Sequence, residues 1–149
     1  MTDRQLSPLA LEAQICFDLY STSLAMTQVY KPYLEELNLT YTQYLIMLVL
    51  WQNDGISLKE IASALFQKPG ALTPVVKRME ADGLLKRVRS KEDERYMQVT
   101  LTKEGQMLKQ KGLRVNQCMR ENFAGDNQDL YTLSLQLKQL RAKLRSTID

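Results

Sequence analysis

The stretch that decides the fold covers residues 57–102 and reads SLKEIASALFQKPGALTPVVKRMEADGLLKRVRSKEDERYMQVTLT. Ser57 and Glu60 form a capping-box pattern, which predicts a short helix that ends near residue 66. After a break at residues 67–70, a second helix is expected to continue to about residue 81. Gly83 then ends it, because glycine adopts the left-handed conformation found after many helices. The pattern predicts two short helices joined by a tight connection.

The hydrophobic period changes from helical to alternating after this glycine. Residues 84–89 are expected to form a short strand, residues 90–95 a charged turn and residues 96–101 a second strand. The stretch thus predicts a β-hairpin directly after a helix-turn-helix. This order of a capped helix, a basic helix, a glycine stop and a basic hairpin favours DNA binding over a plain helical bundle with solvated charges.

Positive charge is concentrated in the same part of the chain. Residues 59–91 contain eight Lys or Arg and three Asp or Glu, a net charge of +5, whereas the whole chain carries +3. On the second helix, Thr73 and Lys77 lie four residues apart on the face opposite the apolar residues, with Arg78 at the flank. Such a helix can enter the major groove of double-stranded DNA. The hairpin adds further basic residues, which suit contacts to the minor groove, namely Arg87, Arg89, Lys91 and, at its tip, Arg95.

The segments on either side of this stretch predict helices with apolar faces. Residues 9–30 have apolar side chains at helical spacing, and Pro32 limits that helix. Thr40 and Gln43 form a second capping-box pattern, before an apolar helix at residues 44–51. Near the carboxyl end, Thr102 can cap a helix to about residue 122. The last helix has leucines at coiled-coil spacing, namely Leu130, Leu133, Leu137, Leu140 and Leu144. Apolar helices at both ends need a partner, and a second copy of the chain is the simplest one.

Several absences argue against an enzyme. The chain has no histidine and only two cysteines, so histidine-dependent catalysis and the common zinc sites are excluded. It also has no CxxC motif and no glycine-rich phosphate loop. We therefore expect no metal, no cofactor and no catalytic activity. The longest apolar run is too short to cross a bilayer, and no secretory signal is readable, so a cytoplasmic protein without membrane contact is expected.

The same stretch resembles the MarR family of transcriptional regulators. The resemblance rests on residues 57–66, on ALTPVVKRME at residues 71–80, and on Asp93-Glu94-Arg95 followed by VTLT and Gly105. It implies a mainly α fold with a small β-hairpin, a winged helix-turn-helix in a single domain over residues 1–149. The DNA-binding lobe would cover about residues 40–102, and interlocked dimerisation helices about residues 8–32 and 103–148. It also implies a two-fold symmetric operator, with Asp93 bracing Arg95 and Arg95 in the minor groove.

One position departs from the family pattern. Pro69 stands where relatives often have a hydroxyl residue, and proline offers no donor to a DNA phosphate. Lys68, beside it, is expected to make that phosphate contact instead. Pro74 lies inside the second helix, where it predicts a bend.

The amino-terminal third resembles the organic-hydroperoxide-sensing (OhrR-type) branch of this family. The matching segments are ICFDLY at residues 15–20, YKP at residues 30–32 and LTYTQYL at residues 39–45. The resemblance implies a repressor in which organic hydroperoxides oxidise Cys16 and DNA is released. It also implies that Tyr30 and Tyr41 of the other subunit bond the reactive sulfur.

The residues themselves allow two interpretations of Cys16. It lies on an apolar stripe, where a cysteine often serves only for packing. No Lys or Arg occurs at residues 5–29, so hydroxyl groups are the remaining means of stabilising a thiolate. Tyr20 is one helical turn away, but Tyr30 would be about 21 Å away along a continuous helix and could reach only a partner's cysteine. Cys118, on a mainly polar face, is either the thiol that resolves oxidised Cys16 as a disulfide or an incidental surface residue.

Two other functions remain open. The chain could be a MarR-type regulator that responds to a small aromatic ligand, with Cys16 in a structural role. It could also be a thiol peroxidase, which usually needs a cation or a helix start beside its cysteine, and neither is readable near Cys16. Consumption of one peroxide per subunit would indicate a sensor, whereas sustained turnover would indicate an enzyme.

Overall fold

The computed structural model describes residues 7–93, 95–123 and 127–148. The chain divides into two compact units, Met1–Val115 and Asn116–Asp149. Expectations about the first residues and about Glu94 lie outside the described part. Within the described part, no helix combines the length and the hydropathy that crossing a membrane requires.

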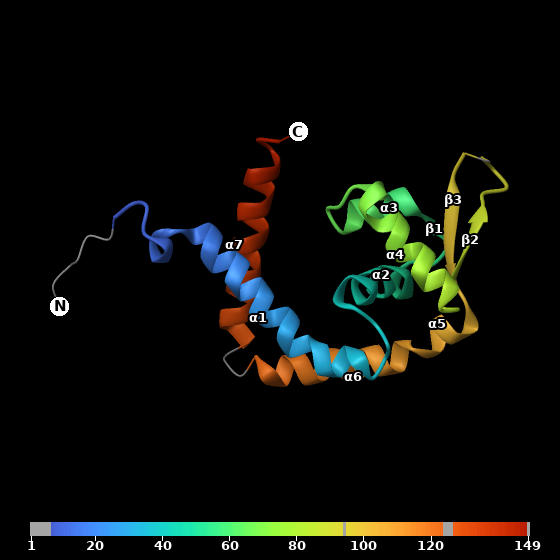
Figure 1. The fold of residues 1–149 in the computed structure, drawn as a ribbon, viewed down its shortest axis with the longest axis horizontal. Coiled ribbons are helices and arrows are strands. Elements are labelled where there is room, and N and C mark those ends of the chain that lie inside the picture. Colours follow the sequence, from blue (N-terminus) through green and yellow to red (C-terminus); the bar gives the residue numbers. More distant parts are fainter. Residues whose placement is uncertain (1–6, 94, 124–126, 149) are drawn as a thin grey trace. The chain divides into compact units, whose positions relative to one another are not determined.

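The first unit contains most of the elements in Figure 1. In chain order they are a 3-10 turn η1 (Leu11–Ala13), α1 (Ile15–Glu35), α2 (Tyr41–Gln52), β1 (Ile56–Ser57), α3 (Leu58–Ala64), α4 (Pro69–Ala81), β2 (Leu85–Arg89), β3 (Met97–Leu101), α5 (Lys103–Met107) and the start of α6 (Lys109–Asn122). The helix α6 ends in the second unit, which also holds α7 (Asn127–Arg145).

The predicted hairpin is present, and a third strand joins it. The antiparallel sheet has the order β1-β3-β2, with Leu85 opposite Leu101 and Arg89 opposite Met97. The extra strand β1 has two residues, of which Ile56 pairs with Val99. This strand was not predicted, because two residues are too few to show an alternating pattern.

The core of the first unit lies between α2, α3, α4 and the sheet. Its most buried side chains include Tyr44, Met47, Leu50, Ile61, Leu72, Val76, Met79, Leu85 and Val99. Three of these belong to the predicted inner face of α4. Burial of this face fixes the rotation of α4, so that Thr73 and Lys77 lie on its outer side.

Both predicted capping boxes are formed. Thr40 and Gln43 exchange two hydrogen bonds at the start of α2, at 3.0 and 3.2 Å. Ser57 and Glu60 do the same at the start of α3, at 2.8 and 3.1 Å. The predicted stop is also confirmed, since Gly83 has a φ of +81°.

The two prolines of α4 do not interrupt it. Lys68 is the N-cap and Pro69 the first helical residue, a position at which the missing N–H costs no helical hydrogen bond. Pro74 lies inside the helix, which nevertheless continues to Ala81. The departure from the family pattern at Pro69 is therefore compatible with the helix itself.

The expected first helix is wrong at both ends. It begins at Ile15 rather than near residue 9, because Gln14 is extended after η1, where its side-chain amide donates to the carbonyls of Pro8 and Ala10 at 2.6 and 3.2 Å. It also continues through Pro32 to Glu35, since one missing N–H does not stop a long helix. As a result, Cys16 lies in the first turn of α1.

The helix expected between Thr102 and residue 122 is divided into α5 and α6. Two glycines let other groups approach closely there. A Cβ on Gly105 would collide with the Leu84 carbonyl, and one on Gly112 would lie 2.6 Å from the Trp51 indole. The indole Nε1 donates to the Gly105 carbonyl at 2.9 Å. Trp51 thus fastens α2 to α5 and to the first part of α6.

Candidate DNA interface and cysteine site

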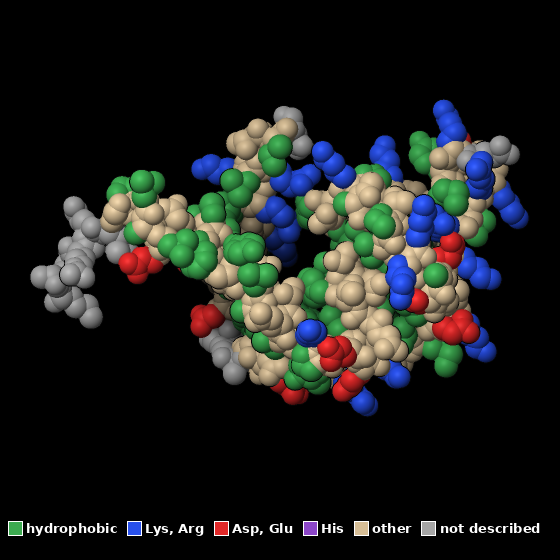
Figure 2. Space-filling model, in the orientation of Figure 1, with side chains coloured by type: hydrophobic (Ala, Val, Ile, Leu, Met, Phe, Trp, Pro, Cys, Tyr) green, Lys and Arg blue, Asp and Glu red, His purple; other side chains and the backbone are tan. Residues whose placement is uncertain are grey.

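The outer side of α4 carries the candidate major-groove residues. Lys77 and Arg78 are exposed, and Thr73 is half-buried, with its hydroxyl donating to the Pro69 carbonyl at 3.0 Å. Arg78 forms a 3.5 Å ion pair with Asp82. Lysine and arginine side chains gather over α4 and the hairpin on the face seen in Figure 2. This charge distribution matches the phosphate backbone of DNA.

The turn of the wing, between β2 and β3, is held by its own hydrogen bonds. Ser90 donates its N–H to the Tyr96 carbonyl at 2.8 Å, and its hydroxyl accepts the N–H groups of Glu92 and Asp93 at 3.3 and 3.4 Å. Ser90 itself is nearly buried. These bonds link the two ends of the described part of the turn to one another.

Arg95 is held at the tip by the brace that the family resemblance implies. Its Nε donates to Asp93 Oδ1 and its Nη2 to Oδ2, both at 3.1 Å, and its backbone N–H also donates to Oδ1. These bonds favour the carboxylate and hold the pKa of Asp93 below its usual 3.8. The side chain of Arg95 is 87 % exposed. The brace orients the guanidinium and leaves it open to solvent.

Arg87 differs from Arg95 in exposure, since its side chain is only 27 % exposed. Its guanidinium and its backbone N–H both bond the carboxylate of Glu80, at 2.7 to 3.2 Å. Lys68 and Arg89, in contrast, are exposed. Glu80 was not among the predicted site residues, because only the reversal of the chain after α4 brings it beside Arg87.

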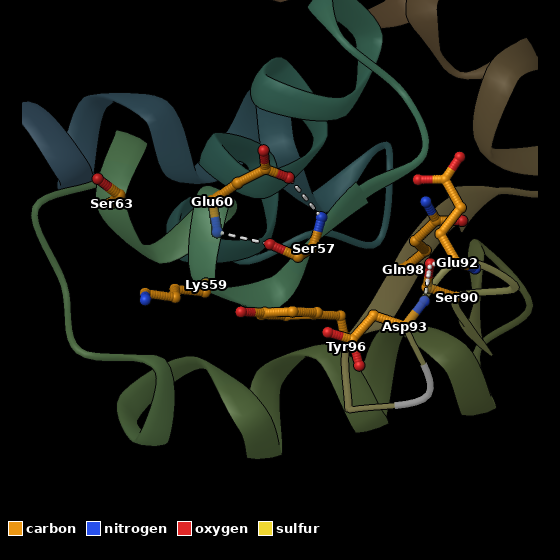
Figure 3. A pocket seen from close by; sticks show the side chains of 9 residues that line it. All are labelled: Ser57, Lys59, Glu60, Ser63, Ser90, Glu92, Asp93, Tyr96 and Gln98. Carbon is orange, nitrogen blue, oxygen red and sulfur yellow. Dashed lines mark hydrogen bonds between the residues drawn. The ribbon is translucent and has the colours of Figure 1, made fainter.

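A cavity of about 580 Å³ lies between α3 and the wing. Figure 3 shows that Tyr96 points from the wing toward α3, where Lys59 lies. Glu60 is held in its capping box and Asp93 by Arg95, so two of the carboxylates that line the cavity already have partners. Among the described residues, no group of His, Cys, Asp and Glu is arranged to hold a metal ion.

Cys16 is an exposed free thiol. It lies in the first turn of α1, so the expectation that no helix start is near it is wrong. Its neighbours Ile15 and Phe17 are exposed apolar side chains, and Tyr20, one turn along, is 65 % exposed. Cys118 is also a free thiol, partly exposed on α6 in the second unit.

Tyr30 and Tyr41 meet although they come from different helices. Their ring centroids are 5.1 Å apart, and Tyr44 completes a cluster with centroids 5.8 Å from Tyr30 and 6.5 Å from Tyr41. Burial, with the neighbouring Tyr41 and Tyr44, raises the pKa of Tyr30 to about 12, and burial also raises the pKa of Tyr41. The phenols therefore stay protonated as donors at neutral pH. Tyr44 was not among the predicted site residues, because its place in an apolar helix is typical of an ordinary core residue.

An apolar hollow of about 470 Å³ adjoins this cluster. It is lined by α1 and by the start of α2, with Leu34, Leu39 and Tyr41 among its walls. Most of its exposed lining is apolar, and Lys31 and Glu35 are also among the lining residues. The hollow can therefore receive an organic group with an apolar part.

Comparison with known proteins identifies this architecture. The family model for the transcriptional regulators SarA and Rot matches residues 28–111. The organic hydroperoxide resistance transcriptional regulator of Bacillus subtilis (strain 168) is 46% identical over 107 residues, which cover 72% of this chain and 73% of that protein. The chain belongs to the MarR family. It falls in the organic-hydroperoxide-regulator branch, as the sequence predicts.

Solved structures of MarR-family proteins support the same conclusion. The structure of reduced AbfR bound to DNA has 30% identity and a TM-score of 0.80, and the match covers 100% of both chains. AbfR is a protein of Staphylococcus epidermidis. Its disulfide-formed structure, also 30% identical, has a TM-score of 0.64 and covers 93% of this chain and 92% of that chain. This MarR-family chain is a DNA-binding transcriptional regulator with a winged helix, and the proteins it matches are regulators rather than enzymes.

Proposed function

We propose that this regulator is a homodimeric repressor that leaves its operator when an organic hydroperoxide oxidises Cys16. The observation that carries the proposal is the pairing of Tyr30 and Tyr41, with centroids 5.1 Å apart. The helix α1 is continuous from Ile15 to Glu35, so Tyr30 lies about 21 Å along it from Cys16. Two protonated phenols brought together at that distance suit a sulfur atom of a second subunit.

Cys16 is a free thiol, the group that a peroxide oxidises. Its thiolate attacks one peroxide oxygen. A sulfur–oxygen bond forms, the oxygen–oxygen bond breaks, and the reduced peroxide leaves as an alcohol after taking a proton. The apolar hollow beside Tyr41 favours an organic peroxide over hydrogen peroxide, because it can receive an alkyl or aryl group.

Cys118 is proposed as the resolving thiol. Its sulfur attacks the sulfenic sulfur of Cys16, a disulfide forms, and water leaves. The existence of a disulfide-formed structure of AbfR, a relative 30% identical, supports this second step. The partly exposed position of Cys118 is compatible with it.

A dimer is proposed because α1 and α7 each carry exposed apolar side chains. On α7, the exposed leucines include Leu130, Leu133, Leu137 and Leu144. Two copies would present two α4 helices to successive major grooves about 34 Å apart, which implies a two-fold symmetric operator. The residues proposed to contact DNA are Lys68, Thr73, Lys77, Arg78, Arg89 and Arg95, with Asp93 as the brace. Arg87, also a candidate from the sequence, has its guanidinium bound to Glu80.

A gel-shift experiment tests the sensor. The probe is a DNA duplex that the wild-type protein selects from a random-sequence pool, and the oxidant is tert-butyl hydroperoxide. Oxidised wild type should release the duplex and run as a covalent dimer on a non-reducing gel. Cys16→Ser should stay bound under the same treatment, because it lacks the reacting sulfur.

Cys118→Ser is the matched control. It should consume one peroxide per subunit at Cys16 but form no covalent dimer without an added thiol. Release of DNA from Cys16→Ser, at the wild-type peroxide concentration, would contradict the sensor and favour the regulator of a small aromatic ligand. Sustained turnover of peroxide by wild type would indicate a peroxidase.

A further inference from the structure

Glu80 is a carboxylate on α4, beside the strand β2, among the basic side chains of α4 and the hairpin. It follows the buried Met79 on α4, and its side chain is 32 % exposed. Both of its oxygens are used by one residue. Oε2 accepts the backbone N–H of Arg87 at 2.7 Å, and Oε1 accepts Nε and Nη2 of Arg87 at 3.2 and 3.0 Å. These bonds lower the pKa of Glu80, so the carboxylate is fully charged at neutral pH.

The contact between Glu80 and Arg87 joins α4 to the hairpin of β2 and β3, the two elements that are expected to contact DNA. The chain reverses between them, where Gly83 and Leu84 donate their N–H groups to the carbonyls of Glu80 and Met79, both at 3.0 Å. Arg87 is the central residue of β2 and lies opposite Val99 of β3. A side chain of α4 that holds Arg87 by its backbone as well as its guanidinium therefore holds the whole hairpin.

We propose that Glu80 is a positioning residue for DNA binding, which acts through Arg87 to fix the angle between the recognition helix α4 and the wing. The exposed Arg95 lies at the far end of a hairpin, so a small rotation at its base displaces the tip most. With this angle fixed, α4 can lie in the major groove while Arg95 enters the minor groove. Neither Glu80 nor Arg87 has to contact DNA for this role.

The alternative is that Arg87 contacts a phosphate and Glu80 only balances its charge. The two alternatives predict opposite effects of Glu80→Gln. Removal of a negative charge beside DNA, with no other consequence, raises affinity. Loss of the clamp, the hydrogen bonds between Glu80 and Arg87, lowers the affinity for DNA. The expected loss is about tenfold if one charge-assisted hydrogen bond is lost.

The experiment measures affinity for a duplex that the wild-type protein selects from a random pool. Glu80→Gln should lower the affinity about tenfold. The control Glu92→Gln, which removes an exposed carboxylate from the turn of the wing, should leave the affinity unchanged or raise it. Both variants are compared with wild type by thermal melting and circular dichroism. An unchanged or raised affinity for Glu80→Gln would overturn the proposal.

A second arm separates positioning from general damage to the fold. In the Arg95→Ala background, Glu80→Gln should change affinity by less than about twofold, because the contact that the clamp serves is already lost. The same tenfold loss in both backgrounds would overturn the proposal. Arg87→Lys, which keeps the charge but not the planar fork, repeats the test should Glu80→Gln melt below the assay temperature.

The salt dependence of binding tests the alternative directly. In the Arg95→Ala background, Arg87→Gln should leave the slope of log affinity against log salt unchanged. A slope that falls by about 0.9, the value for one phosphate contact, would show that Arg87 binds DNA itself and would overturn the proposal. The test uses DNA binding alone, so its outcome is independent of the peroxide response.

Discussion

At the scale of single residues, Tyr44 differs from its two neighbours in the tyrosine cluster. It is only 1 % exposed, and its hydroxyl is the one buried side-chain polar atom without a hydrogen-bond partner in the described part of the chain. Burial raises its pKa, so the group stays a neutral phenol. A buried hydroxyl without a partner has lost its bonds to water, which costs about 1–3 kcal/mol. Tyr44 is therefore a local weakness in an otherwise well-packed helix.

Removal of this hydroxyl should stabilise the protein. We expect Tyr44→Phe to raise the free energy of unfolding by about 1 kcal/mol, measured by urea denaturation, because no bond is lost with the oxygen. Tyr41→Phe, at a half-buried position of the same cluster, is the control and should give no such gain. A Tyr44→Phe protein less stable than wild type would mean that the hydroxyl has a partner in solution.

At the scale of elements, the sequence predicted what depends on neighbouring residues and missed what depends on distant ones. The two capping boxes and the stop at Gly83 are local patterns, and all three are formed. The strand β1 exists only through its pairing with β3, and the clamp of Glu80 on Arg87 only through the reversal after α4. The early start expected for α1 failed because Gln14 breaks an apolar pattern that looks continuous.

The attachment of α2 to α6 gives a prediction at this scale. Gly112→Ala should lower the free energy of unfolding by about 1–3 kcal/mol, because the new Cβ would lie 2.6 Å from the Trp51 ring. The control is Gly70→Ala, in the first turn of α4, where a Cβ meets nothing within 4 Å. That change should be neutral or stabilising by up to about 1 kcal/mol, since alanine is the better helix former. Equal effects of the two substitutions, in thermal or urea unfolding, would contradict the packing argument.

At the scale of the whole molecule, the apolar faces of α1 and α7 decide the proposed assembly. The winged helix was predictable because local patterns within residues 57–102 indicate each of its elements in order. The candidate cysteine site was predictable only through the family resemblance, since Tyr30 and Cys16 lie far apart on one helix. When a site includes residues of two subunits, the spacing of those residues within one sequence does not reveal it.

The assembly can be tested by a charge on α7. Leu137, an exposed leucine, should lie in the dimer interface, so Leu137→Asp should sediment as a monomer at micromolar concentration where wild type is a dimer. Its affinity for a two-fold symmetric duplex should fall by about 100-fold or more, because the second half-site no longer adds to binding. Lys138→Asp, at the next and also exposed position, should stay dimeric. A dimeric Leu137→Asp would place the interface elsewhere.

The position of Trp51 has a practical consequence, because it is the only tryptophan in the chain. Its indole meets Tyr44 edge-on, with centroids 6.4 Å apart, and donates to the Gly105 carbonyl. Excited tyrosines of the cluster can pass their energy to an indole this close, and its emission colour depends on the polarity around the ring. The protein therefore carries an intrinsic fluorescent probe between the tyrosine cluster and the base of the wing. A stopped-flow trace of unlabelled protein mixed with peroxide would time any rearrangement there against the loss of DNA.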